Sequence, residues 1–162
     1  LIARSRIFFV GTADPNLCAH PEGLGPVNVS PKGGVPLRVV SPGEVAYLDF
    51  PGSGNETARH SVAGGPITIM VCSFEEGDAA IVRLYGTASV LPVDESPIGE
   101  ELLAGGQDGA DLRTRQVVSM AVESTMTVIV TVAESPSARL PRFAMTTPPA
   151  SPAVPWLDIT ST

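Results

Sequence analysis

The sequence is poor in several residues on which common functional classes depend. Its 162 residues include two cysteines, Cys18 and Cys72, and two histidines, His20 and His60. Two cysteines are too few for a disulfide scaffold or a cysteine-based zinc site, and unpaired thiols favour a cytoplasmic protein. Neither histidine has other ligands near it at metal-binding spacing. We therefore expect no metal site.

The sequence also lacks the charge and the apolar runs that two classes of partner require. Lys and Arg number 10 against 17 Asp and Glu, which gives a net charge of −7. A nucleic-acid-binding domain typically carries a basic face, so this class is disfavoured. No apolar run reaches the length of a membrane span, and no signal-peptide pattern opens the chain. We expect neither nucleic acid nor membrane as a partner.

Familiar catalytic motifs are missing as well. The chain has no Gly-x-Gly-x-x-Gly after a strand, no phosphate-binding loop ending in Gly-Lys-Ser/Thr, and no Gly-x-Ser-x-Gly elbow. The acidic residues are scattered, so they single out no catalytic carboxylate pair. The sequence therefore assigns no catalytic residue.

The residues that are present predict a mainly β domain. Hydrophobic residues make up 43% of the chain, which excludes a disordered chain, and 16 Gly and 16 Pro disfavour long helices. Short apolar runs are expected to form strands at 5–12, 25–30, 37–40, 45–50, 67–74, 80–91, 115–122 and 127–132. The first two and the next two are expected to pair as hairpins, and Gly86 marks a bend or bulge.

Helices are expected to be short. One is predicted over residues 56–60, stopped by Gly64 to Pro66, and one or two helical turns over residues 98–103. Closely spaced strands with little helix favour an antiparallel barrel or sandwich over a parallel sheet. We expect one domain over residues 1–134 and an extended or disordered arm over residues 135–162, where Pro, Ser, Ala and Thr dominate.

Two segments carry groups that bind anions. In residues 28–34, the Ser30 hydroxyl, backbone N–H groups beside two glycines and the ammonium of Lys32, the only lysine, can hold a phosphate. The alternative is a polar turn with a solvated lysine. Residues 52–60 form a glycine loop that leads into a helix N-terminus, which attracts anions. Ordinary helix capping is the alternative there.

Five motifs occur in a characteristic order. They are Phe-Phe-Val-Gly-Thr-Ala (8–13), Val-Asn-Val-Ser-Pro-Lys-Gly (27–33), Val-Ala-Tyr-Leu-Asp (45–49) with Gly-Ser-Gly-Asn-Glu-Thr-Ala (52–58), Ile-Thr-Ile-Met (67–70) with Cys-Ser-Phe-Glu (72–75), and Arg-Leu-Tyr-Gly (83–86). Over residues 7–90 the chain resembles the pyridoxamine 5'-phosphate oxidase-related proteins, the FMN-binding split-barrel group. Five motifs in the right order are far more specific than any one alone.

The resemblance implies a six-stranded antiparallel split β-barrel with one or two short helices, forming a homodimer with FMN at its interface. It implies a set of cofactor-binding residues, which are Asn28, Ser30, Lys32, Tyr47, Leu48, Ser53, Gly54, Asn55, Thr57, Ser73 and Arg83. Within this set, Ser30 and Lys32 lie along the flavin and its phosphate, and Tyr47 and Leu48 lie under the ring. The resemblance further implies that Ser53, Gly54, Asn55 and Thr57 hold the ribityl-phosphate end.

The resemblance ends in the C-terminal part of the chain. Relatives continue with a Ser-Cys-Gly-Tyr-Gly-Val-Pro-like stretch, whereas residues 126–132 here read Met-Thr-Val-Ile-Val-Thr-Val. The substrate-binding motif of the true oxidase, with its Trp, Arg and His, is missing, and Trp156 alone does not supply it. We therefore do not expect activity on pyridoxamine phosphate.

Three functions are compatible with this sequence. The first is an FMN-dependent oxidoreductase acting on an unidentified small molecule, in which the flavin supplies the redox chemistry. The second is a non-catalytic module that binds or stores a flavin, or binds haem. The third is a structural dimer that has lost its cofactor. A visible spectrum of the purified protein distinguishes them.

Overall fold

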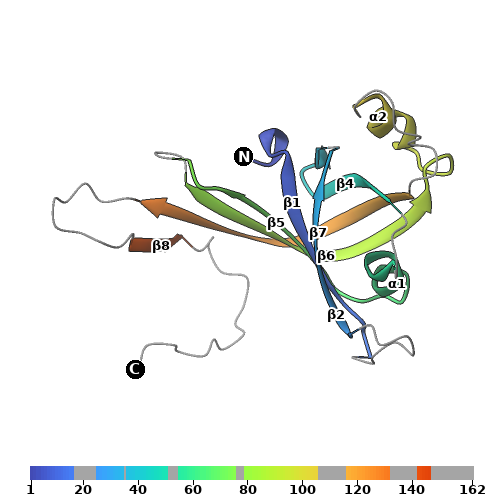
Figure 1. The fold of residues 1–162 in the computed structure, drawn as a ribbon, viewed down its shortest axis with the longest axis horizontal. Helices are drawn as coiled ribbons and strands as arrows, with labels where there is room; N and C mark the ends of the chain where they lie inside the picture. The colour runs from blue at the N-terminus through green and yellow to red at the C-terminus, as the bar shows by residue number, and fades with distance from the viewer. Residues whose placement is uncertain are drawn as a thin grey trace.

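The computed structural model describes residues 1–16, 25–34, 36–50, 55–75, 79–105, 116–131 and 142–146, which form one antiparallel sheet with short helices (Figure 1). The strands in this part of the chain are β1 (Ile7–Ala13), β2 (Val27–Gly33), β3 (Arg38–Ser41), β4 (Glu44–Asp49), β5 (Ile67–Ser73), β6 (Ala80–Pro92), β7 (Gln116–Thr131) and β8 (Arg142–Thr146). The helices are the 3₁₀ turn η1 (Ile2–Arg4), α1 (Glu56–Val62) and α2 (Gly99–Ala104). The expected mainly β antiparallel class with short helices is confirmed, with eight strands in the described residues rather than six.

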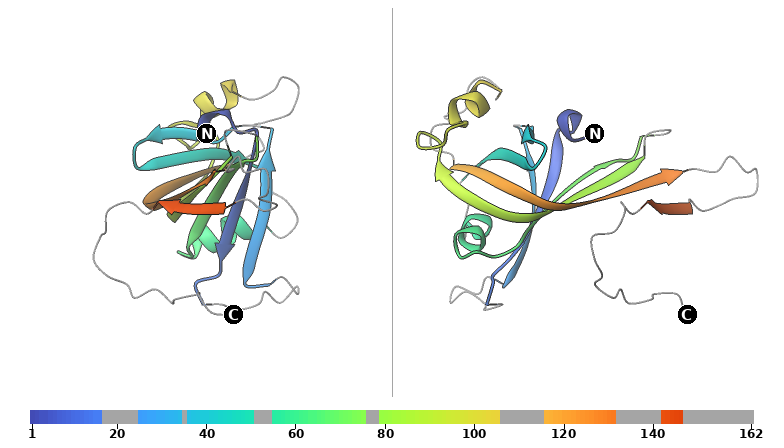
Figure 2. Two further views of the ribbon diagram at one scale, coloured as in Figure 1. Left: turned by 90° about the vertical axis from the view of Figure 1, so that its left-hand side faces the viewer. Right: turned by 180° about the vertical axis from the view of Figure 1, so that it is seen from behind.

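The strand order places distant parts of the chain side by side. The order is β2-β1-β5-β6-β7-β4-β3, and β8 pairs with β7 beyond this path. Every pairing is antiparallel, and both expected hairpins, β1 with β2 and β3 with β4, are present. Figure 2 shows how strongly the sheet curves. The curvature brings β2 and β4, which lie near opposite ends of the sheet, within ion-pair distance of each other at Lys32 and Asp49.

One expected break in the chain is absent. The sequence predicted separate strands at 115–122 and 127–132, but β7 runs without interruption over both, so that prediction was wrong. The polar stretch 123–125 stays extended because β6 pairs with β7 along almost its whole length. On its other edge, β7 pairs with β4 up to Ala121 and with β8 from Thr127. Strand β8 lies within the expected C-terminal arm, and the remainder of that arm lies outside the described residues.

Gly86 lies at a bulge, as expected. The β6–β7 register shifts between Tyr85, opposite Ser124, and Gly86, opposite Val122. A Cβ atom on Gly86 would lie 1.9 Å from the carbonyl oxygen of Ala121, so only glycine lets the two strands approach this closely.

The main core fills the inside of the curved sheet. Burial alternates along β5, since Ile67, Ile69 and Val71 are buried and the residues between them are partly exposed. The buried members of this cluster are Phe8, Val10, Leu37, Val45, Tyr47, Ile67, Ile69, Val71, Leu84, Val118 and Met120. A second cluster beside α2 is made of Ala46, Leu48, Val93, Leu102 and Val117. Strand β4 therefore contributes side chains to both clusters, which fixes its position.

Helix α1 packs against β1 and β6 and confirms the predicted short helix. Its buried His60 is bonded through Nδ1 to the Thr12 hydroxyl at 3.0 Å, which ties the helix to β1. The helix ends before Gly64, whose φ of 81° suits glycine, in agreement with the predicted stop. None of the helices in the described residues has the length and apolar character needed to span a membrane.

Candidate functional site

A small polar pocket of about 190 Å³ lies between β2, the end of β4 and the start of α1. Its described lining residues are Asn28, Ser30, Lys32, Asp49, Phe50, Asn55, Glu56 and Thr57. Residues 51–54, which join β4 to α1, lie outside the described residues. The pocket is therefore lined by residues of both segments that the sequence singled out as candidates for anion binding.

The alternation of β2 places three polar side chains on the pocket side. Successive side chains of a strand point to opposite faces, so Asn28, Ser30 and Lys32 share one face. These three are partly buried, whereas Val27 and Val29 on the other face are 62% and 70% exposed. Pairing with β1 fixes this register, because Lys32 lies opposite Phe8 and Ser30 lies opposite Val10.

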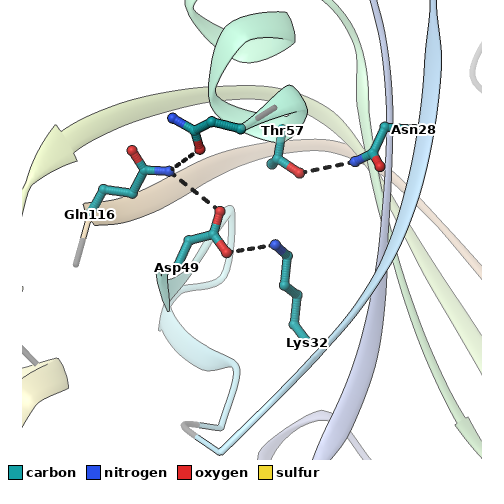
Figure 3. Close-up of polar contacts among 6 residues, drawn as sticks. Asn28, Lys32, Asp49, Thr57 and Gln116 are labelled. Atoms are coloured by element: carbon teal, nitrogen blue, oxygen red, sulfur yellow. Dashed lines mark hydrogen bonds and ion pairs between the residues drawn. The ribbon is translucent and has the colours of Figure 1, made fainter. Parts of the chain in front are cut away.

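The strongest polar contact in the pocket joins β2 to β4. The Lys32 ammonium donates to Asp49 Oδ1 at 2.6 Å, with side-chain exposures of 19% and 5% (Figure 3). The other carboxylate oxygen, Oδ2, accepts a weak bond from Gln116 Nε2 at 3.4 Å. Gln116 also donates to Asn55 Oδ1 at 2.9 Å. A chain of contacts thus runs from β2 through β4 and β7 to the start of α1.

A second contact joins β2 directly to α1. Asn28 Nδ2 donates to Thr57 Oγ1 at 3.2 Å (Figure 3). Asn55, the residue before the helix, has a φ of 44°, in the left-handed region that asparagine tolerates better than most residues. Its side chain does not cap α1, because its amide oxygen accepts from Gln116 instead.

Two of the hydroxyl groups that are buried without a hydrogen-bond partner among the described residues belong to the expected cofactor-binding set. They are Ser30 Oγ, on the wall of the pocket, and the hydroxyl of Tyr47, in the core. Burial, and to a smaller extent the negative charge of Asp49, raises the pKa of Tyr47 well above its usual value, so this phenol stays neutral. Buried hydroxyls are usually bonded, so Ser30 Oγ marks a position where a ligand or water accepts or donates a bond.

Carboxylates outnumber the single ammonium in the pocket. Lys32 carries the positive charge, whereas Asp49 and Glu56 each carry a negative one. Because Lys32 is already paired with Asp49, its charge is largely compensated within the protein. The described lining is therefore suited to hydroxyl groups held by directional hydrogen bonds, whereas an anionic group must share Lys32 with Asp49 or displace Asp49.

The structure brings together five of the residues expected to bind a cofactor. Asn28, Ser30, Lys32, Asn55 and Thr57 all line the pocket. The expected Ser53 and Gly54 lie outside the described residues.

The other four expected residues lie away from the pocket lining. The side chain of Tyr47 is fully buried in the main core, edge-on to Phe8 with ring centroids 5.1 Å apart, and Leu48 is buried in the second cluster. Ser73 lies beside the N-terminal residues of the chain, at the far end of β5. Arg83 lies on β6, opposite Met70.

Sequence reasoning did not assign Asp49, Phe50, Glu56 or Gln116 to the site. Asp49 and Glu56 flank the glycine loop in the sequence. Their position next to a candidate anion-binding segment could therefore have assigned them to the site. Gln116 has no such signal, because only the β4–β7 pairing places it opposite Asp49.

The opposite face of the sheet is apolar and partly exposed. Cross-strand pairing aligns Pro31, Phe9, Met70, Arg83 and Met126 in a row across five strands. We call this row, together with Val27 and Val29, the outer face. Its residues are partly or fully exposed, so the outer face is a surface with apolar character and one central arginine.

No family model matches the chain, but one curated protein is similar to it in sequence. The chain is 43% identical over 91 residues to the pyridoxamine 5'-phosphate oxidase family protein ustO of Aspergillus flavus. The match covers 54% of this chain, and the chain spans only 33% of the length of that relative.

Solved structures are similar in fold. HupZ of Group A Streptococcus matches with a TM-score of 0.58 and 20% identity, over 78% of this chain and 87% of that one. A candidate pyridoxamine 5'-phosphate oxidase from Lactobacillus delbrueckii matches with a TM-score of 0.52 and 19% identity, over 75% of this chain and 84% of that one. At these identities the structures show the fold alone. The resemblance to pyridoxamine 5'-phosphate oxidase-related proteins is thus confirmed, in sequence over 91 residues and in a mainly β split-barrel fold.

Proposed function

We propose that this protein binds FMN and, with the flavin bound, acts as an oxidoreductase on a small molecule. The observation that carries the proposal is the pocket itself, where Lys32, the Ser30 hydroxyl and the Asn28–Thr57 pair meet at the start of α1. FMN supplies the electron transfer when it is bound, and the protein supplies binding and orientation. The similarity to a pyridoxamine 5'-phosphate oxidase family protein supports this choice of ligand.

The donors present suit the phosphate and polyol parts of FMN. Ser30 Oγ, which has no other partner among the described residues, is available for a hydrogen bond to a phosphate oxygen, and Lys32 Nζ can donate a charged one while it also contacts Asp49. Asn55 and Thr57, with Ser53 and Gly54, are proposed to hold the ribityl-phosphate end. Because their side chains are buried, Tyr47 and Leu48 are proposed to act only through the β4 backbone.

The proposal includes a homodimer with the flavin at the interface. At about 190 Å³ the described pocket is smaller than the roughly 300 Å³ at which ligand pockets usually begin, which supports a site completed by a second copy. The surface proposed for that contact is the exposed apolar outer face at the β2 edge of the sheet, where Val27 and Val29 alternate with the pocket residues Asn28 and Ser30. Arg83 on this face and Ser73 at the end of β5 are proposed to approach the flavin only in the dimer.

The proposal also covers the setting and the substrate class. Two cysteines in 162 residues favour a reducing, cytoplasmic location. The substrate is proposed to be a small molecule other than pyridoxamine phosphate, since the Trp, Arg and His motif for that substrate is missing from the sequence.

The test begins with the visible spectrum of the purified protein and titration with FMN. Flavin absorbance, or saturable uptake of added FMN, is expected. Reduction by dithionite or NAD(P)H, followed by reoxidation with candidate acceptors, then tests turnover. A colourless protein that takes up no FMN would rule the proposal out.

A non-catalytic flavin-binding or storage module is the second candidate. It is favoured by the described pocket lining, in which no histidine, cysteine or tyrosine side chain is available as a proton donor or nucleophile. A haem-binding version finds no support in His60, which is buried and bonded to Thr12. FMN uptake without turnover by any tested donor and acceptor would favour this second candidate.

A further inference from the structure

Asp49 already occupies the position beside Lys32 that an anionic ligand would take. The carboxylate lies 2.6 Å from the Lys32 ammonium and lines the same pocket. Lys32 is the only lysine in the sequence, and no arginine lines the described part of this pocket. A ligand phosphate must therefore either share Lys32 with Asp49 or displace that carboxylate.

The Asp49 carboxylate is held in its position beside Lys32 by burial and by a second hydrogen bond. Its side chain is only 5% exposed, and its second oxygen accepts from Gln116, which is itself bonded to Asn55. Figure 3 shows the carboxylate between Lys32 and Gln116. An ammonium has three N–H donors, so sharing Lys32 is possible, but the phosphate then lies close to a fixed negative charge.

We propose that Asp49 is a specificity-determining residue of this pocket: its carboxylate competes with the anionic group of a ligand for Lys32. It thereby reduces the preference of the pocket for a phosphate-terminated flavin over the same flavin without phosphate. This inference rests on the proposed flavin-binding function and assigns a role within that site to a residue outside the expected set.

The physical argument is the charge balance of the pocket. With Asp49 and Glu56 ionised, one positive charge faces two negative charges before any ligand enters. Two like charges this close near a protein surface repel strongly enough to offset a single charged hydrogen bond. Removing the Asp49 charge therefore favours a phosphate group and leaves a neutral ligand end unaffected.

The experiment compares FMN with riboflavin on the full chain. Dissociation constants for both ligands are measured for the wild type, Asp49→Asn and the control Glu56→Gln. We expect Asp49→Asn to raise the preference for FMN roughly tenfold, with little change for riboflavin. Glu56→Gln removes the same charge from the same pocket without releasing Lys32, so its effect on the preference is expected to be clearly smaller.

A double-mutant cycle with Lys32→Gln isolates the competition. If Asp49 acts partly through Lys32, the gain from Asp49→Asn is smaller when Lys32 is already neutral, because only the direct repulsion between Asp49 and the phosphate then remains. Asp49→Ser is measured in parallel, because it also removes the charge and keeps the test available where Asp49→Asn does not fold. An unchanged or lowered preference in the folded variants would overturn the inference. Failure of the wild type to bind either flavin would instead overturn the proposed function.

Discussion

The Asp49 carboxylate at the end of β4 holds the Lys32 ammonium on β2 at 2.6 Å, although four strands, β1, β5, β6 and β7, lie between β2 and β4 in the sheet order. This pair connects two parts of the sheet that no backbone ladder joins among the described residues. The polar pocket lies at the same place, because the sheet curves round without closing there. The Lys32 ammonium is therefore both a proposed ligand-binding group of the pocket and one half of the ion pair that holds β2 and β4 together.

Lys32→Ala is expected to weaken FMN binding by about 1.5–3 kcal/mol, the value of a hydrogen bond to a charged group. The loss should be smaller for riboflavin, which lacks the phosphate. Equilibrium titration monitored by flavin fluorescence measures both.

Arg38→Ala is the matched control for Lys32→Ala. It also removes one positive charge, but Arg38 lies on β3, is paired with Glu101 of α2, and does not line the pocket. Its FMN affinity should equal that of the wild type. An equal loss in both variants would show that net charge, rather than Lys32, determines the affinity.

Tyr47→Phe is expected to raise the free energy of unfolding by about 1 kcal/mol at pH 7. The Tyr47 hydroxyl is buried without a partner among the described residues, so removing it removes an uncompensated desolvation cost. The ring and its edge-on contact with Phe8 are retained. Urea denaturation measures the difference, and a loss of more than 1 kcal/mol would show that the hydroxyl is bonded in solution.

The same variant is expected to be less sensitive to alkali. Burial raises the pKa of Tyr47 above the value of 10.0 that applies in the unfolded chain. The folded state therefore retains this proton more tightly, and that contribution to stability is complete below pH 10 and decreases as the pH rises beyond it. The stability difference between Tyr47→Phe and the wild type should thus widen between pH 9 and about pH 11.

Much of the fold was predictable because local signals and tertiary pairing agree. The turn at Pro42 and Gly43 marks the β3–β4 hairpin, and alternation on β5 gives its buried face. The strand break expected near Glu123 is absent, because pairing with β6 keeps a polar stretch extended. No local residue pattern in β7 indicates that β6 pairs with it along this stretch.

The site was predictable only in part, for a related reason. Strand alternation fixes the common face of Asn28, Ser30 and Lys32, and the glycine loop marks the neighbourhood of Thr57. The partner of Lys32 was missed because Asp49 meets it only after the sheet has curved. The fully buried side chain of Tyr47 depends likewise on the main core, which the motif around it does not reveal.

Gly86→Ala is expected to destabilise the protein by about 2–3 kcal/mol, because the added Cβ would meet the Ala121 carbonyl oxygen at 1.9 Å and force the strands apart. The control is Gly43→Ala, in the β3–β4 turn, where no atom lies within 4 Å of the added Cβ and φ is not positive. Its stability should stay within about 0.5 kcal/mol of the wild type. Thermal unfolding of both variants gives the comparison, and similar values would contradict the close approach of β6 and β7.

Val29→Lys is expected to convert the proposed homodimer to a monomer. Val29 is 70% exposed on the outer face, so in an isolated chain the substitution should hardly change stability. In a dimer formed through this face, it would bury a lysine without a partner, which is strongly unfavourable. Light scattering measures the mass, and Val62→Lys, at a valine of α1 that is 75% exposed, is the control and should leave the dimer intact. Because the pocket is proposed to be completed by the second copy, Val29→Lys should also weaken FMN binding. A Val29→Lys monomer that binds FMN as tightly as the wild type would refute the shared site, and so would a wild type that binds FMN as a monomer.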